Sequence, residues 1–447
     1  MFRPLYSQRA NESPYWNEQL ETMPRAELDA MHLKRLRALI RHAYQNIPMY
    51  RELYDQAGVK PEDIRTLDDY VKKLPSIDKQ TVAKYQNQGK SAVEGSEEFV
   101  SFLYQTSGST GKPLLEPGHF PDVINLWTYQ WWAHGIRPAD IFFFAFPFGT
   151  FMAFWAAYFD AHLIGAQVIS AGGVDSQTRI RQILQFRPTV LIATPTYAMR
   201  LAEVAKEMGV DSRATSIRIV STAGEAGSIV PAIRRAIETA WNAKAIDLYG
   251  ISELWGSTSW ECPAHQDRMH LSECTAHGIV VDENGELVPE GGRGEFVLTN
   301  YEATIQPLIK YRTHDVVEWY KEPCDCGRSW LWLRGGVLAR TDQMVTVKGT
   351  NVYPTSIQAL LGEIVALSER LEIHIDGDEV QAKVSVKVEP CVEVADRSYP
   401  DLQHVAEALL HDKIGVTIPV EVVPPAHLPR YELKAKMVFD HRVRRAS

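Results

Sequence analysis

The chain has 447 residues, of which 45% are hydrophobic, and its formal net charge at pH 7 is -9. This length exceeds what one hydrophobic core supports, so we expect two or more domains. The acidic balance argues against a protein that mainly binds nucleic acid or an anionic membrane surface. No apolar run approaches the length of a membrane span and the first residues lack a signal-peptide pattern, which predicts a cytoplasmic protein.

The predicted elements begin with an amphipathic helix within residues 25–55. Apolar residues recur there at helical spacing, at Leu28, Met31, Leu33, Leu36, Leu39 and Ile40. From about residue 140, buried strands alternate with stretches of helical length, which predicts an α/β sheet. The expected strands are residues 141–146, 166–169, 190–193, 218–221 and 245–248.

The final third of the chain has a different pattern. The alternation in residues 294–299 predicts a smaller antiparallel sheet or barrel within residues 278–320. Further along, apolar alternation in residues 372–375 and 384–388 flanks a predicted helix at residues 401–413. These last elements predict a separate small α+β domain.

Residues 104–113 form a run of small, hydroxyl-bearing and glycine residues closed by a lysine. Its central residues are Ser107, Gly108, Ser109, Thr110, Gly111 and Lys112. Glycines let the backbone approach a polyphosphate, hydroxyls donate hydrogen bonds to its oxygens, and the lysine adds a positive charge. A Walker loop would need glycine at Thr106 and a hydroxyl residue at Pro113, so the run predicts another kind of nucleotide site. The alternative is a flexible surface loop.

Four further motifs follow this loop, at Asp247–Glu253, Tyr311–Asp315, Arg340–Met344 and Gly349–Pro354. Together with the loop they resemble the ordered core motifs of adenylate-forming enzymes, and within that superfamily the phenylacetate-CoA ligase family. The resemblance covers almost the whole chain. It implies an α/β fold with a large N-terminal adenylation domain, which includes a small β subdomain, and a small mobile α+β C-terminal lid.

We place the boundary between these two domains near Arg340 to Asp342. The N-terminal domain is then residues 1–340, which would bind ATP and the acyl substrate, and the lid is residues 341–447. In the family, the lid rotates between the two half-reactions at the position that Asp342 resembles. Such a rotation is a gating device.

The resemblance also implies roles for individual residues. Lys112 would act on the phosphates, Glu253 would hold Mg²⁺ between them, and Asp315 would chelate the ribose hydroxyls, although His314 replaces the family's glycine before that aspartate. Arg340 would reach a ribose hydroxyl. The other implied nucleotide contacts are Gly224, Glu225, Ala226, Asp247, Tyr249, Gly250 and Ser252. Outside the family context, Glu253 is equally a carboxylate at a helix N-terminus, and Asp315 is a turn residue.

Two lysines near the C-terminus are candidates for the catalytic lysine of the lid. By register from Pro429 and Arg430, the resemblance implies that Lys434 approaches the carboxylate and the α-phosphate during adenylation. Leu433 stands where the family usually has glycine. Lys436 is the alternative, and an exposed basic tail without a catalytic role is another.

The five cysteines form an odd count without a secretory signal, which argues against a disulfide scaffold. Several lie near histidines at spacings that suit a closed, structural zinc site. Some members of the phenylacetate-CoA ligase family look similar here. The candidate ligands are Cys262, His265, His270, Cys324 and Cys326. The resemblance favours His270 as the fourth ligand, and His265 is the alternative. If no metal binds, these residues are free buried thiols and surface histidines.

The segment of residues 127–158 is dense in aromatic side chains. Such residues are more often core than ligand pocket, and the tryptophans at its start are expected to pack a helix. The family's pocket segment falls at residues 147–151, so the resemblance implies a flat apolar wall for an aryl or short hydrophobic acid. The implied acid-binding residues are Phe148, Gly149, Phe151, Thr194, Tyr249 and Gly250.

The predicted activity is the ATP-dependent ligation of a carboxylic acid, with an aryl acid favoured, to coenzyme A. The acid would attack the α-phosphate of ATP to give an acyl adenylate and pyrophosphate, and the thiol would then displace AMP. In a second hypothesis, the acyl group of the adenylate is transferred to the phosphopantetheine thiol of a carrier protein and AMP leaves. The third hypothesis is a non-catalytic nucleotide- or acyl-binding protein. The expected cofactors are ATP, Mg²⁺, coenzyme A and structural Zn²⁺, and a homodimer is one alternative for the assembly.

Overall fold

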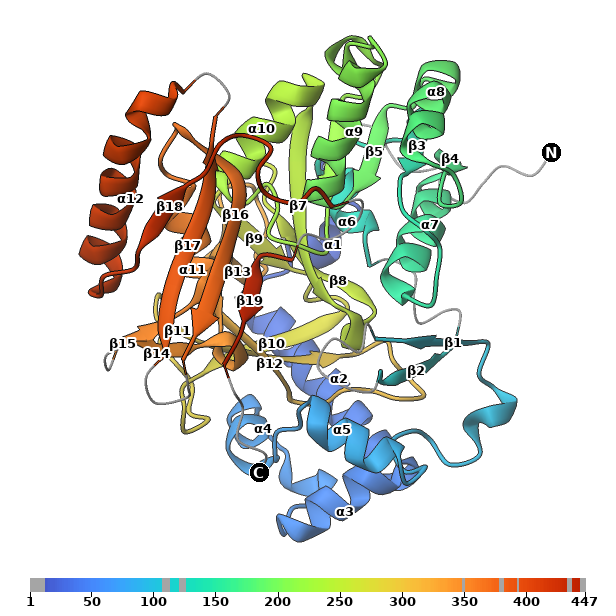
Figure 1. Ribbon diagram of the computed structural model, residues 1–447. Helices are drawn as coiled ribbons and strands as arrows, with labels where there is room; N and C mark the ends of the chain where they lie inside the picture. Colours follow the sequence, from blue (N-terminus) through green and yellow to red (C-terminus); the bar gives the residue numbers. More distant parts are fainter. Residues whose placement is uncertain are drawn as a thin grey trace, which may run out of the picture. The chain divides into compact units, whose positions relative to one another are not determined.

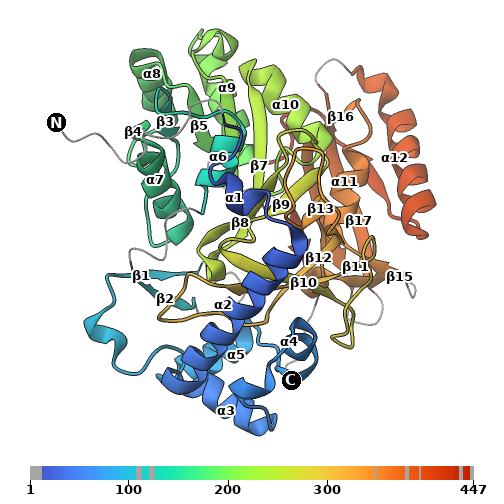
Figure 2. The same ribbon diagram turned by 180° about the vertical axis from the view of Figure 1, so that it is seen from behind.

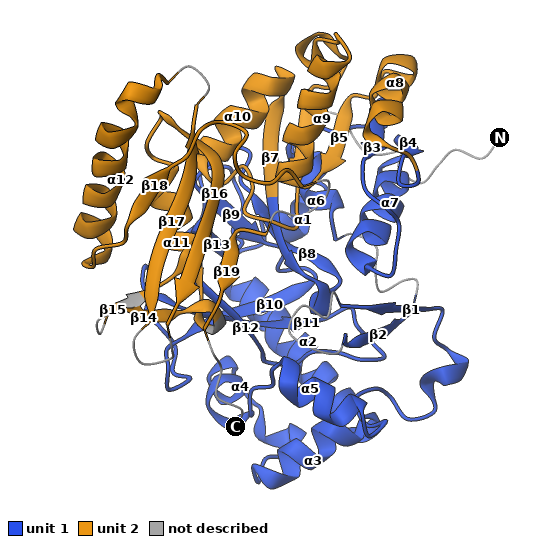
Figure 3. Ribbon diagram, in the orientation of Figure 1, with its two compact units in different colours: residues 1–173, 248–336 blue, residues 174–247, 337–447 orange. Residues whose placement is uncertain are grey.

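The computed structural model describes residues 13–106, 113–119, 126–347, 350–377, 382–391, 394–431 and 436–442, without the side chains of Asp342 and Asn351. Figure 1 shows the ribbon, and Figure 3 distinguishes two compact units of the chain. Unit 1 comprises Met1–Gly173 and Leu248–Gly336, and unit 2 comprises Val174–Asp247 and Val337–Ser447.

The predicted N-terminal helix is present, but it is divided into α2 (Arg25–Asn46) and α3 (Pro48–Gln56), which are separated by the extended residue Ile47. Pro48 explains the break, because proline disfavours helical backbone at the preceding residue and suits the first position of a helix. Unit 1 also contains α1 (Glu18–Glu21), α4 (Leu67–Lys73), α5 (Lys79–Gln86), α6 (Thr128–Ala133) and α7 (Met152–Ile164). Among the described residues, no helix has the length and apolar character that crossing a membrane requires.

The antiparallel strands predicted within residues 278–320 are present, but they do not form a smaller sheet or barrel of their own, because they belong to the main sheet of unit 1. Its strands lie in the order β10-β11-β12-β13-β9-β8-β7. Their bounds are β7 (Lys244–Ile251), β8 (Gly256–Glu261), β9 (Arg268–Leu271), β10 (Ala276–Val281), β11 (Arg293–Asn300), β12 (Tyr311–Tyr320) and β13 (Trp332–Arg340). Unit 1 also contains β1 (Phe102–Gln105) and β2 (Leu115–Gly118), which form an antiparallel sheet of two strands, and β3 (Ile141–Phe144), which pairs in parallel with β4 (Gln167–Ser170).

The first part of unit 2 alternates strands and helices as predicted. The buried strands β5 (Val190–Ala193) and β6 (Ile219–Thr222) and the first residues of β7 run parallel. The helices of this part are α8 (Ser176–Phe186), α9 (Pro195–Glu207) and α10 (Pro231–Trp241). Asp175 and Thr194 begin α8 and α9, because each side chain accepts a hydrogen bond from a backbone amide of the first turn.

The C-terminal part of unit 2 has its own sheet, in the order β18-β17-β16-β19 (Figure 1). The helices α11 and α12 belong to the same part and are labelled in Figure 2. Buried aliphatic residues from Val345 to Val422 form a core there. The elements are β14 (Val345–Val347), β15 (Thr350–Val352), α11 (Pro354–Leu361), β16 (Leu367–Asp376), β17 (Lys383–Pro390), α12 (Tyr399–Ile414), β18 (Val420–Val422) and β19 (Val438–Asp440). The expected strands and helix of this region are confirmed, whereas the boundary at residues 340–341 stays a prediction.

A fully buried ion pair holds α1 against the loop that precedes β13. The side chains of Glu21 and Arg328 are both 0% exposed, and Arg328 Nη2 lies 2.7 Å from Glu21 Oε2. Arg328 Nη2 also donates to the carbonyl of Pro14 at 2.9 Å, and Glu21 accepts from the amide of Asn17 at 2.8 Å. Burial raises the pKa of Glu21, and the charge of Arg328 acts in the opposite direction.

Replacing Glu21 with glutamine should lower the free energy of unfolding by about 3 kcal/mol, because it leaves the guanidinium of Arg328 buried without its counter-charge. Urea unfolding followed by circular dichroism measures this change. Glu18→Gln, on an exposed position of the same helix, is the matched control and should cost less than about 0.5 kcal/mol. Equal costs for the two variants would contradict a stabilising role for the pair.

Candidate functional site

The predicted phosphate loop joins β1 to β2 in unit 1. Its residues Ser107–Lys112 lie outside the described residues, but both ends of the loop are defined. The amide of Thr106 donates to the carbonyl of Leu114 at 2.9 Å, and Thr106 Oγ1 accepts from the amide of Leu114 at 3.0 Å. Thr106, which departs from the Walker pattern, therefore closes the base of the loop.

Tyr249 and Asp315 come from two different motifs and are in direct contact. Tyr249 lies on β7 and its hydroxyl donates to Asp315 Oδ2, on β12, at 2.6 Å. Asp315 is 2% exposed, and its amide donates to Thr313 Oγ1 at 3.1 Å. The fold therefore brings together two predicted nucleotide residues that are 66 positions apart in the sequence.

The backbone at His314 adopts the conformation that the family's glycine would provide. Its φ angle is 63°, which lies in the left-handed region that residues with a Cβ seldom adopt. The amide of His314 donates to Glu295 Oε1 at 3.1 Å, and its ring Nδ1 lies 3.4 Å from the same oxygen. These contacts with Glu295 hold the turn, so the substitution leaves Asp315 in place.

Gly250 and Glu253 follow Tyr249 where β7 pairs with β8. A Cβ on Gly250 would lie 1.8 Å from the carbonyl oxygen of Gly256, so only glycine fits this bulge. Ser252 and Glu253 belong to a short 3-10 helix, Ser252–Leu254. Glu253 Oε1 lies 3.0 Å from Lys79 Nζ at the start of α5. Lys79 belongs to none of the recognised motifs, so sequence reasoning missed it.

In unit 2, the turn that carries the predicted nucleotide contacts Gly224, Glu225 and Ala226 follows β6. Asp247 stabilises this turn, because its Oδ1 accepts from Thr222 Oγ1 at 3.1 Å and its Oδ2 accepts from the amide of Ile229 at 3.0 Å. Gly224 has a φ angle of 89°, and Thr196 Oγ1 donates to Glu225 Oε2 at 2.6 Å. A pocket that opens to solvent borders the turn; residues that line it include Thr196, Arg200, Glu225, Ala226, Arg430 and Lys436.

The predicted lid residues are only partly described. Lys434 lies outside the described residues. The ammonium of Lys436 lies 4.8 Å from the centroid of the Phe439 ring. The hydroxyl of Tyr431 donates to the backbone carbonyl of Lys436 at 3.3 Å. Arg340 is the last residue of β13.

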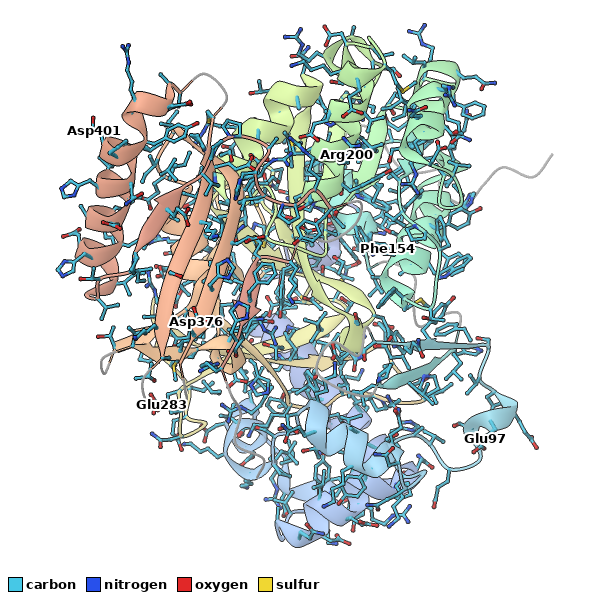
Figure 4. All side chains as sticks on the ribbon, viewed as in Figure 1. Glu97, Phe154, Arg200, Glu283, Asp376 and Asp401 are labelled. Atoms are coloured by element: carbon cyan, nitrogen blue, oxygen red, sulfur yellow. The ribbon has the colours of Figure 1, made fainter. Side chains whose placement is uncertain are left out.

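The aromatic segment forms a continuous cluster in unit 1. Phe148 packs against Trp155 with a centroid separation of 4.9 Å, and Trp155 Nε1 donates to the carbonyl of Gly149 at 2.9 Å. Phe154, labelled in Figure 4, stacks on Phe146 with a centroid separation of 3.7 Å. These aromatic rings provide apolar surface beside the predicted acid-binding residues Phe148, Gly149 and Phe151. The tryptophans Trp127, Trp131 and Trp132 are buried around α6, as predicted.

Thr194 lies in unit 2, where it begins α9. Its hydroxyl oxygen accepts from the amide of Tyr197 at 3.2 Å. This hydrogen bond gives the predicted acid-binding threonine a structural role at the helix terminus.

Four of the five candidate zinc ligands converge in unit 1. One ligand atom from each of Cys262, His270, Cys324 and Cys326 lies within 4.8 Å of the others. Cys262 Sγ and Cys324 Sγ are 3.8 Å apart, and Cys326 Sγ lies 3.3 Å from His270 Nε2. Four donors about 2.0 to 2.3 Å from a tetrahedral zinc ion would be separated by roughly 3.3 to 3.8 Å, so the set fits that ion.

The surroundings of the cluster suit negatively charged sulfur ligands. Guanidinium nitrogens of Arg268 and Arg328 lie 3.5 Å from Cys324 Sγ and 3.8 Å from Cys326 Sγ, respectively. Burial lowers the pKa of His270 and favours the neutral imidazole that binds metals. His265 instead contacts Asp325, with which it forms a second group that includes Cys324.

Comparison with known proteins identifies relatives along the whole chain. Residues 29–304 match the family described as AMP-binding enzyme, and residues 349–442 match the AMP-binding enzyme C-terminal domain. A phenylacetate-coenzyme A ligase of Thermus thermophilus is 31% identical over 96% of this chain and 99% of the relative. The ligase of that name from Aromatoleum evansii is 30% identical over 96% of this chain and 98% of the relative.

Among solved structures, 2-hydroxyisobutyryl-CoA ligase in the postadenylation state, in complex with R3-HIB-AMP, has a TM-score of 0.90. It is 27% identical in sequence, and the match covers 99% of this chain and 95% of that one. The fold and the family that the sequence motifs indicated are therefore confirmed. The chain belongs to the AMP-binding enzyme family, with phenylacetate-coenzyme A ligases among its relatives.

Proposed function

We propose that this protein is an AMP-forming acid–CoA ligase that activates an aryl acid through an acyl adenylate. The main support is the 2.6 Å hydrogen bond between the hydroxyl of Tyr249 and the carboxylate of Asp315, which brings two predicted nucleotide motifs into contact. The relatives support the ligase activity, because matched chains are named phenylacetate-coenzyme A ligase over almost their full length. The aromatic cluster around Phe148 supports an aryl acid.

The reaction brings two anions together, so this protein must lower their repulsion with positive charge and oriented dipoles. Lys112 is the proposed cation of the phosphate loop, and Lys434 is the proposed cation at the carboxylate and the α-phosphate. Both residues lie outside the described residues. Glu253 is the proposed ligand of Mg²⁺, which would neutralise phosphate charge when bound. Asp315, which already accepts one hydrogen bond from Tyr249, is proposed to accept further ones from the ribose hydroxyls.

We place the proposed lid at residues 341–447. The core from Val345 to Val422 supports a C-terminal domain, since it consists of residues from that part of the chain alone. Coenzyme A is the favoured acceptor because the named relatives are coenzyme A ligases. A carrier-protein phosphopantetheine remains the alternative, because it ends in the same thiol.

Exchange of labelled pyrophosphate into ATP, measured over a panel of aryl and short aliphatic acids, tests the proposal. Exchange that depends on an aryl acid is the expected result, and thioester should form when coenzyme A is added. Absence of exchange with every acid would favour the non-catalytic alternative. If thioester forms only with a carrier protein, the carrier protein is the acceptor and not coenzyme A.

Lys434→Ala should abolish acid-dependent pyrophosphate exchange but leave the conversion of a preformed acyl adenylate to thioester. The proposed charge at the α-phosphate is needed only while that phosphorus is attacked. Both half-reactions are measured separately, and Lys436→Ala is the matched control. Equal loss of both half-reactions in Lys434→Ala, or a selective loss in Lys436→Ala alone, would argue against Lys434.

Asp315→Ala should raise the ATP KM at least tenfold, because each lost hydrogen bond to a charged acceptor is worth roughly 1.5 to 3 kcal/mol. Pyrophosphate exchange as a function of ATP concentration measures the change. His314→Gly keeps the carboxylate and supplies a residue that accepts a positive φ angle, so it should retain the ATP KM within about twofold. An unchanged ATP KM in Asp315→Ala would make the aspartate a turn residue.

We further propose that Cys262, His270, Cys324 and Cys326 hold one structural zinc ion. The mutual distances and the soft donors of the described residues support this set, and four protein ligands leave no open position for catalysis. The ion would link the segment after β8, the strand β9 and the loop before Arg328. His265 is excluded from this proposed set because it contacts Asp325.

Protein purified without a histidine tag should contain about one equivalent of zinc per chain, and Cys324→Ser should lose it. The melting temperature should fall by roughly 5 °C or more in this variant, since metal binding stabilises the folded state. Metal analysis and calorimetry measure both changes. His270→Gln should behave like Cys324→Ser and His265→Gln like the wild type, whereas less than about a tenth of an equivalent in the wild type would contradict the site.

A further inference from the structure

A carboxylate on α9 is the shared partner of several arginines in unit 2. Glu203 Oε1 accepts hydrogen bonds from Arg370, on β16, and from Arg430, in the segment that precedes β19. The other oxygen of Glu203 lies 3.4 Å from a guanidinium nitrogen of Arg200, on the same helix. Arg370 and Arg430 are 167 and 227 positions away from Glu203 in the sequence, so the fold brings these groups together.

Arg430 belongs to the segment that leads to the proposed catalytic lysine, Lys434. Residues 432–435 lie outside the described residues, but the base of this segment is defined, because the hydroxyl of Tyr431 donates to the carbonyl of Lys436 at 3.3 Å. Four residues span at most about 14 Å, so the position of Arg430 limits where Lys434 can be. A contact that holds Arg430 therefore also restricts the lysine.

The pocket beside the predicted nucleotide contacts has the same segment in its wall. Glu225 and Ala226 line this pocket together with Arg430 and Lys436, and Glu203 lines it as well. The hydrogen bond between Glu203 and Arg430 therefore ties the segment before the lysine to α9 at the pocket that borders the nucleotide turn.

The exposure of these side chains points to orientation, and not to stability, as the main effect of the contact. Glu203, Arg370 and Arg430 are 27%, 22% and 39% exposed. Ion pairs this accessible to water add little to the free energy of unfolding, because the solvent screens the charges and ordering long side chains costs entropy. Charge-assisted hydrogen bonds of guanidinium groups to a carboxylate are nevertheless directional, so Glu203 fixes where Arg430 lies.

We propose that Glu203 is a positioning residue for Lys434, which it holds in place through Arg430 while the α-phosphate is attacked. This inference rests on the proposed function, because it takes Lys434 as the cation of the first half-reaction. A displacement of about 1 Å at a reacting group can slow a reaction about a hundredfold. Thioester formation does not need the charge at the α-phosphate, so the role of Glu203 is confined to adenylation.

Glu203→Ala should lower the maximal rate of acid-dependent pyrophosphate exchange roughly tenfold and keep the ATP KM within about twofold, since the lysine and not the nucleotide contacts is displaced. Conversion of a preformed acyl adenylate to thioester should be retained, and the melting temperature should change little. Arg430→Met should have the same effect, and the double variant should be no slower than either single variant, because both changes break one contact.

Glu207→Ala is the matched control. Glu207 lies on the same helix and its carboxylate is 3.0 Å from Arg200, but it is 61% exposed, and the hydrogen bonds of Arg370 and Arg430 described above go to Glu203. This variant should retain wild-type rates in both half-reactions.

Limited digestion with endoproteinase Lys-C, which cleaves after lysine, tests the position of the segment without any activity. Cleavage after Lys434 should be about threefold or more faster in Glu203→Ala than in the wild type, because cleavage follows the population of open conformations. Glu207→Ala should be cleaved at the wild-type rate.

Three outcomes would overturn the inference. An equal loss of both half-reactions in Glu203→Ala would mean that the carboxylate has a general structural role. A wild-type rate of exchange, or of cleavage after Lys434, in Glu203→Ala would mean that Glu203 does not hold the segment. Additive losses in the double variant would mean that Glu203 and Arg430 act separately.

The wild type and Lys434→Ala separate this inference from the proposed function. Absence of exchange in the wild type would refute the proposed function, and the role of Glu203 in adenylation with it. Normal exchange in Lys434→Ala would remove the lysine that Glu203 is proposed to position. If the wild type is active and Lys434→Ala is inactive, but Glu203→Ala has the wild-type rate, only this inference is wrong.

Discussion

Charge repulsion is the constraint on which the arrangement of the nucleotide motifs depends. An acid and a triphosphate are both anionic, and Glu253 and Asp315 add two carboxylates to the same motifs. Each carboxylate has a defined partner, since Lys79 Nζ lies 3.0 Å from Glu253 and the hydroxyl of Tyr249 lies 2.6 Å from Asp315. These contacts hold the carboxylate oxygens of Glu253 and Asp315 in defined directions.

Two backbone positions show two different demands that the fold makes on a residue. At Gly250 the opposing carbonyl of Gly256 approaches so closely that no Cβ fits, and glycine is the necessary choice. At His314 the backbone departs from the usual regions, with a φ angle of 63°, but there is room for a side chain. Contacts with Glu295 hold the strained turn. A motif can therefore lose a glycine without losing its geometry, provided that a neighbour holds the turn.

The sequence predicted the fold and the order of the motifs well, because hydrophobic periodicity and motif spacing are local properties. Contacts between segments far apart in the chain could not be predicted from these local patterns. The cysteine spacing allowed either His270, which the resemblance favoured, or His265 as the fourth candidate ligand, and it could not show which histidine lies beside the thiols. β9 pairs with β8 and β13, which places His270 in the interior opposite Trp260 and Trp332. His265 precedes β9 and contacts Asp325 instead.

The carboxylate of Glu116 shows why a polar residue in a short strand is hard to interpret from sequence alone. In a strand with one solvated face, a glutamate is expected on that face. The structure buries it instead, since α5 is tied to the neighbouring residue Leu115 by Gln86. A polar group that is buried without a partner opposes folding, and such costs persist mainly where a site uses them. At Glu116, burial together with the charge of Glu253 raises the pKa of the carboxyl well above its usual value, and the charge of Lys79 acts in the opposite direction.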